Sequence, residues 1–203
     1  LTLLAGLVSY TRGFNVPLIY RIYQRAKGLN RQEIAASLLI LFVIMVQLAK
    51  CAHAYEYDSV WYGLRPEYVL IGAHSFFDSL GLVQYVHYYP KLFELFLAPV
   101  SDLGDYSFIL TFNVILLAFM ALVVYRLGRA FGQQRFDALM MTGLITSLPV
   151  VANIGSTAKA DIFTTLLMLI SVEQLWTGFN KKQTGALVFG AAASLLALGA
   201  KLT

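Results

Sequence analysis

Five long runs of apolar residues, separated by more polar segments, divide the chain and predict membrane-spanning helices. They cover residues 34–52, 106–125, 138–154, 162–177 and 184–202. A bilayer core of about 30 Å requires about 20 helical residues, with about 17 tolerated, so the first, second and fifth runs are long enough to cross it. Pro149 lies near one end of the third run, and the short fourth run contains Glu173. The pattern predicts an all-α integral membrane protein, a polytopic helical bundle.

The overall composition favours the same class. Of the 203 residues, 59% are hydrophobic and 13% are charged, whereas a soluble domain averages about 25% charged residues. The net charge of +4 does not indicate a nucleic-acid partner, because the cations lie at the ends of apolar runs and not in one patch. We therefore expect membrane lipids, and no nucleic acid, around this chain. The single cysteine, Cys51, leaves no intrachain disulfide to form.

The distribution of Lys and Arg predicts the orientation in the membrane. One side carries ten cations and the other carries five. The first group is Arg12, Arg21, Arg25, Lys27, Arg31, Arg126, Arg129, Arg135, Lys181 and Lys182, and the second is Lys50, Arg65, Lys91, Lys159 and Lys201. The side with ten cations should be cytoplasmic, so residues 53–105 form a long outer loop. We expect this loop to face a periplasmic, extracellular or lumenal space.

The domain organisation follows from these spans. Residues 1–33 are predicted to form a cytoplasmic or interfacial lead, and residues 34–203 one transmembrane domain. The chain begins at Leu1 and stops at Thr203 within an apolar run, so we expect it to be a piece of a longer polypeptide.

The first outer loop, 53–105, contains most of the polar chemistry. It holds all three histidines, seven of the eleven acidic residues and twelve aromatic residues. Segments 66–80 and 90–100 are apolar enough to predict interfacial helices, the second starting with Pro90 and ending at Pro99. An aromatic belt that only anchors the protein explains the tyrosines alone. Their clustering with histidine and carboxylates favours a functional loop.

Glu56 and Asp58 lie just beyond the first span, among Tyr55, Tyr57 and Trp61. Carboxylates at a membrane face are often simply solvated. In a partly dry aromatic pocket, one of them is suited to take a proton from an acceptor hydroxyl, or to bind a divalent cation such as Mg²⁺ or Mn²⁺. The three histidines lack the i, i+4 spacing of a helix-borne zinc pair, so no zinc site is predicted.

The second outer turn, 153–163, carries Lys159 and Asp161 at the start of the fourth span. A structural interpretation has Ser156 or Thr157 cap that helix and Asp161 complement its dipole. A functional interpretation makes Lys159 a phosphate contact and Asp161 a second site carboxylate, because ionisable groups at span ends often mark function. Lys201, near the outer end of the fifth span, either snorkels to the interface or contacts a phosphate.

Several segments carry a resemblance to a known family. They are Glu-Tyr-Asp at 56–58, "HYYPKLFELFLAPVSDLGDYSF" (87–108), "RLGRAFGQQR" (126–135), "STAKADIFTTLLML" (156–169) and "AAASLLALGAKLT" (191–203). With the order of spans and loops, they resemble the N-terminal half of GT-C glycosyltransferases, in the group of protein O-mannosyltransferases and aminoarabinose transferases. The chain departs from that group where Tyr88, Tyr89 and Pro90 replace a paired proline.

The resemblance implies an enzyme that transfers a sugar from a polyprenyl-phosphate donor to a glycan, lipid or protein acceptor at the outer membrane face, usually with inversion. It also implies a protein of the bacterial inner membrane whose active site faces away from the cytoplasm. Asp58 matches the catalytic acidic residue, with Glu56 as the alternative. The donor phosphate would lie among cations such as Arg65, Lys91, Lys159 and Lys201. Tyr89 and Asp161 are assigned to the same substrate site.

Two other classes of function stay open from the residues alone. A transporter or lipid carrier would use the charged outer residues as a gate or binding vestibule, and it requires polar residues near the middle of its spans. The main polar residues in these spans are Gln47 and Asn113, and both lie towards span ends, which counts against transport. A non-catalytic membrane subunit or assembly factor would tolerate Asp58→Asn, whereas the enzyme would not.

Overall fold

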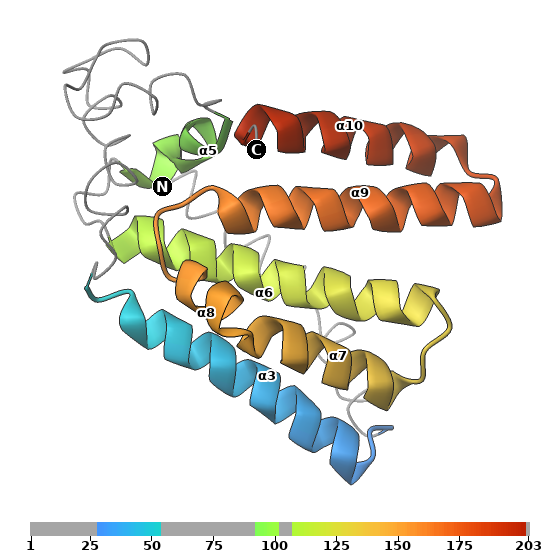
Figure 1. The fold of residues 1–203 in the computed structure, drawn as a ribbon, viewed down its shortest axis with the longest axis horizontal. Helices are drawn as coiled ribbons and strands as arrows, with labels where there is room; N and C mark the ends of the chain where they lie inside the picture. Colours follow the sequence, from blue (N-terminus) through green and yellow to red (C-terminus); the bar gives the residue numbers. More distant parts are fainter. Residues whose placement is uncertain (1–27, 54–91, 102–106, 202–203) are drawn as a thin grey trace, which may run out of the picture. The chain divides into compact units, whose positions relative to one another are not determined.

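The computed structural model describes residues 28–53, 92–101 and 107–201, and within these ranges every regular element is a helix (Figure 1). The helices are α3 (Arg31–Lys50), α5 (Leu92–Ser101), α6 (Ser107–Ala130), α7 (Arg135–Ser147), α8 (Pro149–Ile154), α9 (Asp161–Lys181) and α10 (Thr184–Ala200). Three of them, α3, α6 and α9, are long and apolar enough to cross a membrane. These findings confirm the all-α class and support a membrane protein.

The chain divides into two compact units, Leu1–Ala35 and Ala36–Thr203. In the first, the described residues open α3 with a reciprocal cap. The Asn30 amide oxygen accepts from the Glu33 backbone N–H, and the Glu33 carboxylate accepts from the Asn30 backbone N–H, both at 2.8 Å. Each side chain thereby satisfies a backbone donor that has no partner inside the helix.

In the second unit, many large apolar side chains point outwards. Leu38 and Phe42 of α3 are 58% and 65% exposed, and Phe119 of α6 and Leu195 of α10 are 54% and 69% exposed. Such extensive apolar exposure is unfavourable in water but is ordinary contact with lipid tails. The side-chain arrangement therefore agrees with the length and hydropathy of the helices.

The third apolar run, 138–154, forms two helices instead of one continuous span. Leu148 separates α7 from α8 and has φ −54° and ψ 130°, outside the helical region. Pro149 explains this, because its ring disfavours the helical conformation in the preceding residue. With 13 and 6 residues, neither helix is long enough to cross a bilayer alone.

The fourth and fifth runs also differ from expectation in length. α9 has 21 residues and continues past Glu173 to Lys181, whereas the apolar run ends at residue 177. Glu173 is buried in this helix, and Arg126 of α6 places its Nε 2.8 Å from the carboxylate. α10 has 17 residues, or about 26 Å of helix, and is thus at the lower limit for a span.

Helices α9 and α10 pack side by side through small residues (Figure 1). Gly190, Ala193, Ala197 and Ala200 form the buried stripe of α10, and the hydroxyls of Ser171 and Ser194 lie 2.6 Å apart across the interface. A stripe of small residues lets two helix backbones approach closely, which is how helices commonly associate inside a membrane.

Gly190→Ala should destabilise the protein, although alanine is the better helix former. A Cβ atom at Gly190 would lie 3.0 Å from the backbone nitrogen of Leu175 and 2.8 Å from its Cγ, so α10 must move away from α9. Overpacking of this kind costs about 1–3 kcal/mol. Thermal unfolding in detergent measures the effect.

Gly185→Ala is the matched control, because a Cβ atom there meets nothing within 4 Å. This variant should be neutral or slightly stabilised, since alanine is favoured over glycine in a helix by about 1 kcal/mol. Equal melting temperatures for the two variants would contradict the proposed close approach of α9 and α10.

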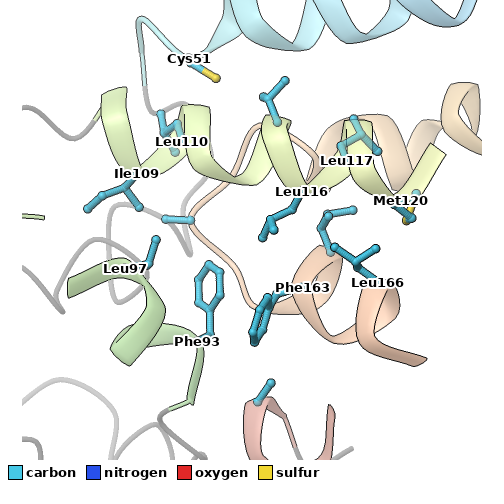
Figure 2. Packing of buried hydrophobic residues seen from close by; sticks show 14 of the residues in the cluster. Cys51, Phe93, Leu97, Ile109, Leu110, Leu116, Leu117, Met120, Phe163 and Leu166 are labelled. Carbon is cyan, nitrogen blue, oxygen red and sulfur yellow. The ribbon is translucent and has the colours of Figure 1, made fainter. Parts of the chain in front are cut away.

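The buried core of the second unit lies among α5, α6 and α9, with Cys51 at its edge (Figure 2). Phe93 and Leu97 of α5 are at most 2% exposed and pack in the same cluster as Ile109, Leu110 and Phe163.

The prediction of a helix within residues 90–100 is confirmed by α5. Its end differs, since α5 continues past Pro99 to Ser101. A proline this near the end removes few helical hydrogen bonds, so the helix continues. The helix predicted over 66–80 lies outside the described residues.

Candidate functional site

Two of the predicted site residues meet at the start of α9. The Lys201 ammonium lies 2.6 Å from Asp161 Oδ1, although the two residues are 40 positions apart. Asp161 is in the first turn of α9, and Lys201 directly follows the last residue of α10. We call this part of the second unit, where α9 begins and α10 ends, the Asp161 end.

The Asp161–Lys201 contact is a charge-assisted hydrogen bond in a half-buried setting. The side chains are 31% and 34% exposed, so water screens the pair and its contribution to stability is modest. Asp161 also complements the positive end of the α9 dipole. The pair therefore holds an ammonium group at a fixed place on the helix end while leaving it accessible from outside.

The predicted capping of α9 by Ser156 or Thr157 is wrong. The N-cap position is Ala160, with no side-chain cap hydrogen bond. Thr157 instead donates to the Ile154 carbonyl, and Ser156 donates to the Gln47 amide oxygen at 3.2 Å. The helix begins at Asp161, several residues beyond both hydroxyls, so neither is placed to reach its free backbone N–H groups.

Asn113 of α6 holds the α8–α9 connection, residues 155–160, through its side-chain amide. The amide nitrogen donates to the backbone carbonyls of Thr157 and Lys159, the second at 2.8 Å. Asn113 is fully buried, and its Oδ1 has no hydrogen-bond partner among the described residues. A buried acceptor without a hydrogen bond costs about 1–3 kcal/mol, so the amide fixes geometry at some expense in stability.

Gln47 contacts the same connection from α3. Its amide oxygen accepts from Ser156 Oγ at 3.2 Å and from Lys50 Nζ at 3.3 Å. Cys51 is buried in the core directly after α3, and its thiol donates to the Gln47 carbonyl. The exit of the first predicted span is therefore tied to the segment that carries Lys159. From the sequence alone, Gln47 and Asn113 are only polar exceptions in apolar runs, and their contacts with this segment are not predicted.

An aromatic cluster packs at the same end. The Phe163 ring of α9 lies 5.7 Å from Phe93 and 5.1 Å from Phe96 of α5, measured between centroids. Phe93 also lies 6.5 Å from Phe112 of α6, and Leu92 of α5 is in reach of Gly199 of α10. The helix of the first predicted outer loop is thus anchored beside the start of α9 (Figure 2).

The remaining predicted site residues, Glu56, Asp58, Arg65, Tyr89 and Lys91, lie outside the described residues. Their convergence with Lys159, Asp161 and Lys201 stays a prediction. Within the described ranges, no group of three or more His, Cys, Asp and Glu side chains is placed to hold a metal ion. The hypothesis of a divalent cation depends on Glu56 and Asp58 and is likewise not tested.

A second ion pair links α6 and α9 far along the helices from Asp161. Arg126 is half exposed, whereas Glu173 is only 6% exposed. Nearby, Phe131 and Trp176 stack edge to face at 4.9 Å, and Trp176 Nε1 donates to the Ala130 carbonyl. From the sequence alone, Glu173 is only a charge near the end of a span, because its partner comes from another helix.

Arg126→Met should destabilise the protein by about 1–3 kcal/mol, because it leaves the buried Glu173 carboxylate without its cation. The double variant Arg126→Met with Glu173→Gln should recover most of that loss. Thermal unfolding of the two single variants and the double variant gives the coupling energy. Simple additivity of the single effects would argue against the pairing.

No protein family, curated protein or solved structure matches the chain. The resemblance to GT-C glycosyltransferases therefore rests on the sequence segments alone and stays a prediction.

Proposed function

We propose that the chain is part of a membrane glycosyltransferase that moves a sugar from a polyprenyl-phosphate donor to an acceptor on the extracytoplasmic face. The single observation that carries the proposal is the contact between Asp161 and Lys201. Both residues were assigned to the substrate site from sequence, and they come from different helices. Their contact puts an accessible ammonium group at the end of an apolar bundle, where a lipid phosphate would lie.

The position of this ammonium group suits a lipid-linked donor. Leu195 and Leu198 of α10 are 69% and 51% exposed, within two turns of Lys201. In a bilayer, this apolar surface would contact a polyprenyl chain while the phosphate stays at the interface. The cation and the apolar surface match the two chemically different parts of such a donor.

The proposed reaction uses a base and preplaced cations. Asp58, or Glu56, removes the proton of the acceptor hydroxyl, whose oxygen attacks the anomeric carbon of the sugar. The bond from that carbon to the phosphate oxygen breaks, and the electron pair stays on the phosphate. Lys201 and Lys159 stabilise the charge that develops on the departing polyprenyl phosphate.

The experiment that tests the proposal is depletion of the full-length protein from its native membrane, with mass spectrometry of the extracted lipids. One polyprenyl-phosphate sugar should accumulate, and addition of the purified protein should convert it to glycosylated acceptor and free polyprenyl phosphate. A lipid carrier would change the sidedness of the donor without breaking its bond to the sugar. An unchanged lipid pool would refute both functions.

A further inference from the structure

We propose that Asn113 is a positioning residue for a phosphate-binding cation, acting through the backbone of the α8–α9 connection. The inference rests on the proposed function, because it takes the phosphate of a polyprenyl lipid as the ligand of Lys159 and Lys201. The residues named so far in that role carry the charge. Asn113 carries no charge, but it fixes the backbone position from which the Lys159 side chain extends.

The geometry is specific to a side-chain amide. One Nδ2 group donates to two carbonyl oxygens, those of Thr157 and Lys159, so both of its protons hold the same short segment. The reversed orientation of the amide would place Oδ1 against two other oxygens and is excluded. The Lys159 carbonyl is therefore fixed to α6, two residues before the Asp161 carboxylate that bonds Lys201.

The connection is held to α6 and α3 by side-chain amides, in addition to its local hydrogen bonds to α8. It runs from Gly155 to Ala160 between α8 and α9, and no side chain caps α9. Besides Asn113, Gln47 holds it through Ser156. Without the amide, the backbone of Lys159 would sample more conformations, and a bound phosphate would have to order it.

The test compares two buried substitutions in the full-length protein in detergent. Asn113→Leu keeps the branching of the side chain and removes both donors. Thr142→Val is the matched control, because Thr142 is also buried but its hydroxyl bonds the Ala138 carbonyl of its own helix. Hydrogen exchange of residues 155–160 reports the connection. Binding of a short-chain polyprenyl monophosphate, which carries no sugar, reports the phosphate site.

We expect Asn113→Leu to raise the exchange rate in 155–160 and to weaken binding of the monophosphate by about tenfold, while Thr142→Val changes neither. Unchanged exchange, or faster exchange with unchanged binding, overturns the inference, and so does a wild-type protein that does not bind the probe. If Asn113→Leu fails to fold, Asn113→Ser serves the same comparison. A protein that binds the probe but transfers no sugar refutes the proposed function and leaves this inference standing.

Discussion

Asp58→Asn is expected to abolish sugar transfer without loss of the folded protein. The amide has nearly the shape of the carboxylate but does not accept the proton of the acceptor hydroxyl. Loss of a general base lowers turnover by about 10²- to 10⁴-fold. The measurement is transfer of labelled sugar from the accumulated polyprenyl-phosphate donor, per mole of purified protein.

Glu56→Gln is the matched comparison, since Glu56 and Asp58 are two positions apart in the same aromatic segment. One of the two variants should lose turnover, and the other should keep most of it, which identifies the base. Full activity in both variants would show that neither carboxylate is the general base and would favour a non-catalytic membrane subunit.

Lys201→Met should have the second largest effect. It removes a cation that is proposed to stabilise the departing phosphate, and deletion of one such preplaced group lowers kcat by about 10²- to 10³-fold. The fold should survive, because the Asp161–Lys201 pair is about one-third exposed and exposed pairs contribute about 0–1 kcal/mol. Rates of transfer at saturating donor measure the effect.

Two further variants separate the charge of Lys201 from the ion pair. Asp161→Asn breaks the pair but leaves the ammonium group, so it should retain more activity than Lys201→Met. Lys181→Met removes a cation from the opposite end of α9 and should be neutral. Equal losses in Asp161→Asn and Lys201→Met would show that the pair matters only as a structural contact.

The helices could be predicted from the sequence where the length of an apolar run alone determines them. The runs at 34–52, 106–125 and 184–202 correspond to α3, α6 and α10 within a few residues, because a membrane-spanning helix requires a long apolar segment. The break at Pro149 was not predicted, because the run 138–154 was expected to form one span, although the effect of a proline on the preceding residue explains it. The length of α9 was not predicted either, because Glu173 depends on Arg126, which lies 47 positions earlier.

The site was less predictable for the same physical reason. Lys159, Asp161 and Lys201 were singled out because charges are rare in such a chain. Asp161 and Lys201 are paired across two helices, and no periodicity in the sequence reports such a pairing. Asn113 was noted as a polar residue in an apolar run. Its hydrogen bonds to two carbonyls more than 40 positions away depend on how the helices pack, so the sequence does not predict them. The Asn30–Glu33 cap is local, and its Asn-x-x-Glu spacing was a signal available in the sequence.

The pairing of Asp161 with Lys201 also bears on how the protein enters the membrane during synthesis. α9 and α10 are joined by two residues, Lys182 and Gln183, and their small-residue interface lets them insert together as a hairpin. In the proposed orientation, the turn stays in the cytoplasm, and the opposite end of the hairpin, which carries Asp161 and Lys201, crosses the hydrocarbon. A carboxylate and an ammonium group that travel as a neutral pair face a lower barrier than two separate charges.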